Sequence, residues 1–248
     1  MDIYREPKIT LIARQVFQDH PGIQWSTDTE VPAERLVEFG GRVCYMSYGK
    51  GRKTNREYIA HIIESGHGSV LEHAQFSFCF EGISRSLTHE LIRHRAGFAY
   101  SQLSQRYVDE SYAAFIEPDD IADDPELHAK WLACVEHCQK TYTDLVEALM
   151  KKNAHVEAAT DRRKLSRQAA RSVLPNATET KIIVTANARA WRHFIELRGS
   201  AHADVEIRKL AVGVLRILQK EAPSLFGDYT IAKLADGSET TDTPHRKV

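Results

Sequence analysis

The sequence feature that most constrains the fold is a period of two in the aromatic residues of the segment 73–80. Phe76, Phe78 and Phe80 recur at every second position, with small or polar residues between them. Because successive side chains of a strand point to opposite faces, this pattern predicts a half-buried strand. The fold is therefore expected to contain a sheet with at least one covered face.

A helix is expected to follow this strand directly. Ser84 is a favoured N-cap residue. Leu87, Leu91 and Ile92 then recur at helical spacing, so all three are expected to face the core. This helix would run straight into Arg93.

Further strands and helices follow along the chain, but they do not alternate regularly as in a doubly wound fold. Branched residues predict strands over residues 8–17 and 180–185. The acidic segment 117–126 contains two prolines and is expected to be an exposed loop. Further helices are predicted over residues 32–43, 54–66, 125–152, 160–173, 187–198 and 203–221, from a capping box at Thr54, from Pro32 and Pro125 at helix starts, and from helical patterns elsewhere. The mixture predicts an α+β fold in a single domain, with a central, mostly antiparallel sheet and long helices packed on it.

Length and composition fit one globular domain. At 248 residues the chain is long enough for one sizeable core, and no linker divides it. Residues 235–248 are polar and lack core residues. We therefore expect the domain to cover residues 1–234 and the remainder to be a mobile tail.

Charge and hydropathy exclude several classes of protein. A net charge of −1 and a pI near 6.9 argue against broad capture of nucleic acid. No apolar run approaches the roughly 20 residues that span a bilayer, and residues 1–8 lack a signal-peptide pattern. The four cysteines form no Cys-x-x-Cys pair, and the clustered histidines fit no standard metal spacing. We expect a cytoplasmic protein with reduced thiols, no metal, and no membrane or nucleic-acid partner.

The densest chemistry lies between Arg93 and Tyr107. This stretch contains three arginines, a histidine, two serines and two glutamines around a few apolar residues. Guanidinium groups match phosphate oxygens, whereas Ser and Gln suit a base or a ring system. The segment is predicted to hold a phosphorylated, planar ligand, and a solvated charged face is the alternative.

Three further segments carry similar groups. The segment 67–73 lies where a helix is expected to end and a strand to begin, so it either faces a ligand or forms a turn with its own hydrogen bonds. Residues 162–171 form a basic helix, which is more often only a solvated face. Residues 187–198 form another helix, on which Arg189 and His193 are the better-aligned pair.

Taken in order, these four segments resemble the conserved blocks of flavin-dependent thymidylate synthases, over about residues 40–220. The family signature is Arg-His-Arg, then seven or eight residues, then serine. Here Arg93-His94-Arg95 is followed by eight residues and Ser104. The resemblance implies an enzyme that makes dTMP from dUMP, with methylenetetrahydrofolate as the one-carbon donor and FAD and NADPH supplying the hydride. It also implies a homotetramer with active sites at subunit interfaces.

The resemblance implies roles for individual positions. Arg198 would lie against the uracil carbonyl and N3 and stabilise negative charge on the ring. Ser104 has no adjacent base evident and would be a hydrogen-bonding residue beside the ring, not a nucleophile. The implied flavin contacts are Ser69, Arg93, His94, Arg95, Gln102, Asn187, Ala188, Arg189 and His193. The implied dUMP contacts are Glu90, Leu91, Ile92, Arg93, Gln102, Leu103, Ser104, Gln105, Arg106, Arg171 and Arg198.

The chain departs from the family pattern at two places, and two rival hypotheses for its function remain. The spacer is one residue longer than the commonest form, so the turn around Gly97 is expected to bulge. Glu90 stands where many relatives carry glutamine.

One rival hypothesis is a nucleic-acid-binding module, in which the same arginines would follow the phosphate backbone and Tyr100 and Tyr107 would stack on bases. A flavoprotein that acts on another substrate is the nearer alternative.

Overall fold

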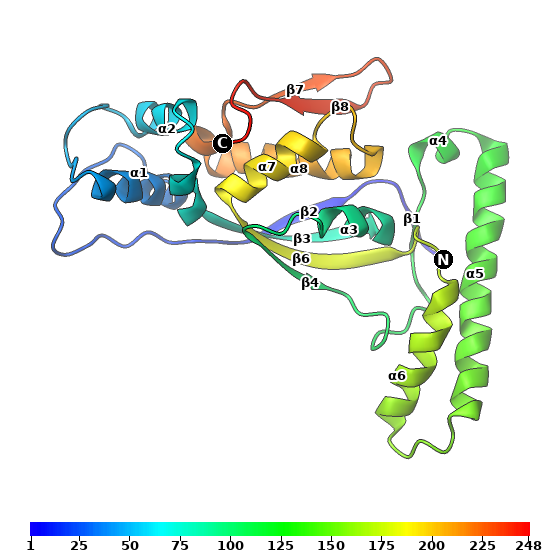
Figure 1. Ribbon diagram of the computed structural model, residues 1–248. Coiled ribbons are helices and arrows are strands. Elements are labelled where there is room, and N and C mark those ends of the chain that lie inside the picture. Colours follow the sequence, from blue (N-terminus) through cyan, green and yellow to red (C-terminus); the bar gives the residue numbers. More distant parts are fainter. The chain divides into compact units, whose positions relative to one another are not determined.

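The computed structural model describes residues 1–248 and shows an α+β fold (Figure 1). Its central antiparallel sheet has the strand order β2-β3-β6-β4. In two smaller sheets, β1 and β5 pair in parallel and β7 and β8 pair antiparallel. The predicted fold class is confirmed. The strands are β1 (Ile3–Tyr4), β2 (Lys8–Arg14), β3 (Gln75–Ser84), β4 (Phe98–Gln102), β5 (Phe115–Ile116), β6 (Glu179–Asn187), β7 (Thr230–Lys233) and β8 (Glu239–Asp242).

The helices agree with the predicted ones to within a few residues, and two short helices were not predicted, α4 and α9. The α-helices are α1 (Pro32–Cys44), α2 (Asn55–Glu64), α3 (Arg85–Leu91), α4 (Asp119–Ala122), α5 (Pro125–Lys152), α6 (Ala159–Ala170), α7 (Ala188–Arg198), α8 (Val205–Glu221) and α9 (Pro223–Phe226). Two 3-10 helices, η1 (Gly68–His73) and η2 (Arg171–Val173), complete the set.

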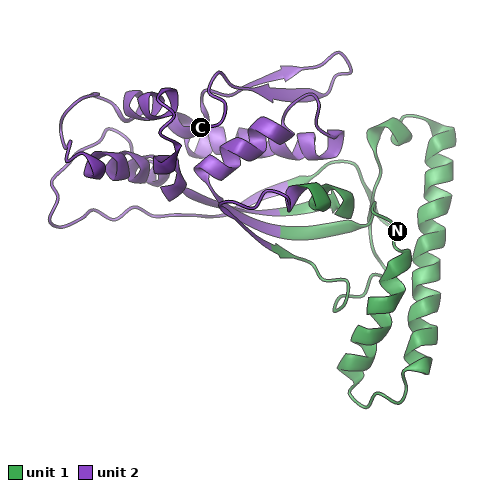
Figure 2. Ribbon diagram, viewed as in Figure 1, with its two compact units in different colours: residues 1–8, 80–90, 101–182 green, residues 9–79, 91–100, 183–248 purple.

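The chain divides into two compact units, each assembled from three stretches (Figure 2). Unit 1 contains residues 1–8, 80–90 and 101–182. Unit 2 contains residues 9–79, 91–100 and 183–248. Strands β3 and β6 each have residues in both units.

The core of unit 2 is built on the strand that the phenylalanines predict. Phe76 and Phe78 are at most 2% exposed. The ring of Phe78 meets Trp191 of α7 edge to face, with the ring centroids 5.1 Å apart, and Trp191 also packs against Phe194. Helix α7 therefore covers the face of the sheet that the alternating phenylalanines predict to be buried.

Unit 1 contains the two helices α5 and α6, which lie side by side (Figure 1). Asp124 caps α5, because its Oδ1 accepts hydrogen bonds from the N–H groups of Glu126 and Leu127. Along the 28 residues of α5, only Val135 and Tyr142 are buried. This long helix is therefore covered within the chain along only part of its surface.

The helix after Ser84 forms as predicted but ends early. Ser84 Oγ accepts a hydrogen bond from the N–H of Leu87 at 3.0 Å, and Leu87 and Leu91 are buried. The prediction that Ile92 faces the core is wrong, because α3 ends at Leu91 and Ile92 is 43% exposed.

The acidic segment 117–126 is not wholly an exposed loop. Helix α4 lies inside it, and Glu117 is 1% exposed. The Glu117 carboxylate accepts a hydrogen bond from Arg5 Nη2 at 2.7 Å and lies 2.5 Å from His128 Nδ1. These partners from elsewhere in the chain allow the charge to be buried, which composition alone could not indicate.

The polar segment 235–248 takes a defined place in unit 2. Its strand β8 pairs with β7 over four residues. Thr241 N–H donates to the Gly199 carbonyl at 2.8 Å, and Thr243 Oγ1 donates to Asp228 at 2.5 Å. Both threonines are buried. Hydrogen bonds thus anchor a segment that lacks large apolar side chains, while its mobility stays a prediction. No helix of the chain is both long and apolar enough to cross a membrane.

Candidate functional site

The implied site residues fall into two clusters, one in each unit. The α7 cluster is the set in unit 2, whose members lie on η1, from the last residue of α3 to the turn before β4, and from the end of β6 along α7. The β4 cluster, in unit 1, runs from the end of β4 to η2 and includes the last turn of α3. The α7 cluster contains Ser69, Leu91, Ile92, Arg93, His94, Arg95, Asn187, Ala188, Arg189, His193 and Arg198. The β4 cluster contains Glu90, Gln102, Leu103, Ser104, Gln105, Arg106 and Arg171.

Helix α7 starts at a tightly packed junction. Asn187 is its N-cap, and Oδ1 of this residue accepts a hydrogen bond from Ala190 N–H at 2.8 Å. Ala188 is buried, and its N–H donates to the Ala74 carbonyl at 2.8 Å. Gly97 has φ +76°, and a Cβ there would lie 2.7 Å from Asn187 Nδ2. Only glycine fits this turn, for conformational and for steric reasons.

A pocket of about 500 Å³ opens beside this junction. Arg189 and His193, predicted to be aligned on one helix face, both line it. The Arg189 guanidinium is held by Glu72, with Nη1 2.6 Å from Oε1. The other lining residues are Ala96, Gly97, Asn187, Ala190, Lys247 and Val248. Lys247 and Val248 were not predicted, because nothing in the polar tail marked them as ligand contacts.

A second pocket of about 380 Å³ shares Arg189 with the first. Ser69, which is exposed, lines it together with His67, Tyr45 and Tyr58. Gly68 forms part of the same wall, and a Cβ on it would lie 2.8 Å from Arg189 Nε. Because Arg189 lines both pockets, an extended ligand could contact both of them through this residue.

His94 and Arg198, implied as a flavin contact and a dUMP contact, meet directly. Arg198 Nε donates to His94 Nε2 at 3.0 Å. His94 is 7% exposed, and its pKa is lowered to about 4, first by burial and then by the charges of Arg198 and His193. The imidazole is therefore neutral near pH 7, with Nε2 as the acceptor and the proton on Nδ1.

The turn before β4 presents two more arginines to solvent. Arg93 and Arg95 are exposed, and neither side chain forms an ion pair or a hydrogen bond within the chain, although the charge of Arg95 acts on Tyr100. Tyr100 holds the turn in place, because its hydroxyl donates to the carbonyls of Leu91 and His94 at 2.9 and 2.6 Å. The backbone is thus fixed while both guanidinium groups stay available to a ligand.

The β4 cluster begins with three residues whose polar atoms are held by neighbours. Gln102 Nε2 donates to Thr88 Oγ1 at 3.1 Å. Leu103 N–H donates to the Lys181 carbonyl at 2.9 Å. Ser104 Oγ accepts from Arg106 N–H at 3.3 Å, and no histidine or carboxylate is hydrogen-bonded to it. Ser104 therefore has no base that would make it a nucleophile.

Buried donors without acceptors follow in the same cluster. Gln105 is 7% exposed, and its Nε2 has no hydrogen-bond partner. The Nε atoms of Arg106 and Arg85 are also buried and unpaired. Orphaned buried donors are costly, so an acceptor supplied by a ligand would stabilise these three side chains, although unpaired Nε atoms also occur in other arginines of the chain.

Arg85 was missed in the sequence. Its Nη2 donates to the Leu103 carbonyl at 3.0 Å and lies 3.9 Å from Glu110 Oε1. Burial holds the pKa of the Arg85 guanidinium below its usual range, and the charge of Arg171 contributes to the same shift. A cation in the first turn of a helix opposes the helix dipole, and this was the one signal that could have identified it.

Comparisons with known proteins identify a family and a similar fold. The family described as "Thymidylate synthase complementing protein" matches residues 27–224. The flavin-dependent thymidylate synthases of Mycolicibacterium gilvum (strain PYR-GCK) and Mycobacterium avium (strain 104) are each 53% identical over 240 residues, covering 96% of this chain and 95% of the relative. The crystal structure of a UMP/dUMP methylase, PolB from Streptomyces cacaoi, bound with 5-Br dUMP has a similar fold, with a TM-score of 0.70 and 20% identity. That likeness covers 92% of this chain and 96% of the other.

Proposed function

This chain belongs to the family of flavin-dependent thymidylate synthases, and from this we infer that it converts dUMP to dTMP with FAD as its cofactor. Methylenetetrahydrofolate donates the one-carbon unit, and NADPH is the source of the hydride. FAD, when bound, supplies the hydride chemistry. The residues of this chain bind, orient and polarise the reactants.

The β4 cluster is proposed as the site of the dUMP phosphate. The observation that supports this best is the set of buried donors without acceptors, Gln105 Nε2, Arg106 Nε and Arg85 Nε. Phosphate oxygens are the acceptors that guanidinium groups match. Arg171 lies close enough to lower the pKa of Arg85, so a dianion would relieve the repulsion between the two cations.

The uracil ring is assigned to Arg198. Its guanidinium carries a fixed positive charge, which would stabilise negative charge on the ring carbonyl and N3. The neutral His94 imidazole accepts from Arg198 Nε and so holds the guanidinium in one orientation. Ser104 contributes a hydrogen bond beside the ring, and Glu90, Leu91, Ile92, Gln102 and Leu103 complete the dUMP contacts.

The α7 cluster is proposed as the FAD site. Arg189 lies between two pockets, with Asn187 and His193 in one and Ser69 in the other. Gly97 and Gly68 leave room at the pocket walls that a Cβ would occupy. Arg189 and His193 would bind the anionic part of the cofactor, and Asn187, Ala188 and Ser69 its neutral groups.

The enzyme is proposed to be a homotetramer whose active sites lie at subunit interfaces. Arg93 and Arg95 support this, because both side chains are exposed and unpaired within one chain although they belong to the family signature. The α5 helix also leaves most of its surface uncovered. Mass photometry should give four times the chain mass of 28.1 kDa.

The location of the enzyme is proposed to be the cytoplasm, because its four free cysteines fit a reducing compartment.

The deciding experiment is release of tritium from C5-labelled dUMP in the presence of NADPH and methylenetetrahydrofolate. Tritium release coupled to dTMP formation is expected. If the protein binds flavin but the flavin absorbance spectrum does not change when dUMP is added, and no tritium is released, a flavoprotein with another substrate would be favoured instead. Loss of Arg171 in Arg171→Ala should weaken dUMP by about 10- to 150-fold, the value of one charge-assisted hydrogen bond, and change FAD affinity little. Equal losses for both ligands would contradict the assignment of the β4 cluster.

A further inference from the structure

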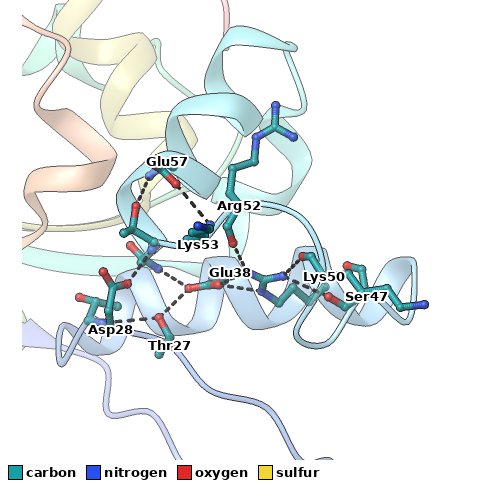
Figure 3. Close-up of polar contacts among 12 residues, drawn as sticks. Thr27, Asp28, Glu38, Ser47, Lys50, Arg52, Lys53 and Glu57 are labelled. Atoms are coloured by element: carbon teal, nitrogen blue, oxygen red, sulfur yellow. Dashed lines mark hydrogen bonds and ion pairs between the residues drawn. The ribbon is translucent and has the colours of Figure 1, made fainter.

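A buried arginine in unit 2 holds an exposed loop in one shape. The loop covers residues 45–53, between α1 and α2, and none of its residues belongs to the core. Arg42 donates from Nη1 to the carbonyls of Ser47 and Lys50 at 3.1 and 2.8 Å, and from Nη2 to the carbonyl of Arg52 at 3.3 Å (Figure 3). Three loop carbonyls therefore point inward to one guanidinium.

The Arg42 side chain that holds the loop forms a buried ion pair with Glu38, and we call the loop that it holds the braced loop. Arg42 is 4% exposed and Glu38 is 1% exposed, and Arg42 Nη2 lies 2.6 Å from Glu38 Oε1. Glu38 Oε2 also accepts from Thr27 Oγ1 at 2.6 Å and from Asn55 Nδ2 at 2.8 Å. Burying two charges is costly unless the pair is well hydrogen-bonded, and the three loop carbonyls supply part of that hydrogen bonding. Such a device indicates that the shape of the loop is needed.

The braced loop presents exposed cations, with the Glu57 carboxylate beside them, where it accepts from Lys53 N–H at 3.3 Å. Lys50, Arg52 and Lys53 are exposed, and so is Arg56 in the first turn of α2. No carboxylate forms an ion pair with any of the four side chains. Figure 3 shows the guanidinium of Arg52 pointing away from the buried pair. The result is a row of free cations on a rigid backbone.

The same guanidinium connects this row to the cofactor region. Arg42 Cζ lies 4.7 Å from the centre of the Tyr58 ring. Tyr58 and Tyr45, the first residue of the loop, line the pocket that also contains Ser69 and Arg189. This pocket is the one proposed for FAD, so a co-substrate that reacts at the flavin could extend an anionic tail along the loop.

We propose that the braced loop 45–53, with Arg56, binds the glutamate tail of the folate co-substrate. Each γ-linked glutamate adds one carboxylate to an extended chain, which suits cations spaced along a loop. A single phosphate would instead favour converging N–H groups and buried donors, whereas here the peptide carbonyls face inward and the cations lie apart. This inference rests on the proposed function, because that function supplies the folate.

The test compares methylenetetrahydrofolate carrying one glutamate with the form carrying five, using the flavin-loaded enzyme. Each exposed ion pair contributes about 1.5- to 5-fold to affinity. The wild type should therefore have a KM at least about fivefold lower for the longer tail, and added salt should reduce this ratio. The variant Lys50→Ala/Lys53→Ala removes two of the four cations and should lower the ratio by about 2- to 25-fold.

The matched control is Lys220→Ala/Lys233→Ala, which removes the same charge from exposed positions of unit 2 outside the loop. This control should keep the wild-type ratio. A wild-type ratio near 1, an unchanged ratio in the loop variant, or a loop variant that alters only the preference for NADPH over NADH would each overturn the proposal. Formation of dTMP tests the proposed function separately. If dTMP forms but KM does not depend on the length of the glutamate tail, only the inference about the loop is contradicted. Absence of dTMP with either folate removes the proposed function and the inference with it.

Discussion

His94 should act as a neutral hydrogen-bond acceptor across the physiological pH range. Burial, together with the charges of Arg198 and His193, lowers its pKa from 6.5 to about 4. The difference is about 2.5, and each pKa unit corresponds to about 1.4 kcal/mol, so the differential interaction is about 3 kcal/mol. Because His94 is 7% exposed, solvent screening removes little of this.

The sign of the effect on stability follows from linkage. Between about pH 4 and 6.5 the unfolded chain binds a proton at His94 and the folded chain does not. The free energy of unfolding is therefore expected to lose up to about 3 kcal/mol from this one group as the pH falls from 6.5 to 4. Above pH 6.5 the contribution is fully present.

The comparison protein is His94→Gln, in which an amide oxygen can accept from Arg198 without titrating. Urea unfolding of both flavin-free proteins, followed by tryptophan fluorescence at several pH values, gives the difference between their free energies of unfolding. That difference should change by about 3 kcal/mol between pH 7 and pH 4. Exchange of the imidazole C2 hydrogen, measured by mass spectrometry, gives the pKa of His94 directly. A value near 6.5, or parallel pH dependences of the two proteins, would refute the reasoning.

Three other substitutions test separate parts of the structure. Arg85→Met should weaken dUMP by about 10-fold or more while leaving FAD affinity unchanged, as isothermal titration calorimetry can measure, and unchanged dUMP affinity would remove Arg85 from the phosphate site. Gly97→Ala should destabilise the fold and weaken FAD, because its φ is +76° and a Cβ would lie 2.7 Å from Asn187 Nδ2; a wild-type melting temperature would contradict this. Phe76→Ala should lower the free energy of unfolding by about 3 to 5 kcal/mol, and a loss below about 1 kcal/mol would show that β3 is less tightly covered than its 2% exposure indicates.

Local signals predicted local structure well. The phenylalanines of β3, the Ser84 and Asp124 caps and the helix that carries Arg189 and His193 all depend on neighbours within a few residues. What could not be predicted depends on partners far along the chain. Glu117 is buried because Arg5 and His128 reach it, and Thr241 is buried because the Gly199 carbonyl accepts its N–H.

The candidate site shows the same division. A family signature could assign Arg106 and Arg198, since both stand in or near recognisable blocks. Arg85 carries no such mark, and only the fold reveals that its Nε is buried beside Leu103 and the charge of Arg171. Strand β4 was also missed, because five residues rich in polar groups resemble a ligand loop as much as a strand.

The assembly of each unit from three separate stretches has a consequence for how this chain can be made and altered. No single cut of the polypeptide releases either unit whole, since residues 80–90 and 101–182 return to unit 1 only after the chain has left it. Contacts within each unit must close loops of many tens of residues before they are made, which slows folding. A ribosome therefore exposes an incomplete unit 1 until residue 182 emerges, and an incomplete unit 2 until residues 183–248 emerge. Truncated fragments should aggregate, and coexpressed halves should recover activity only when both are present during folding.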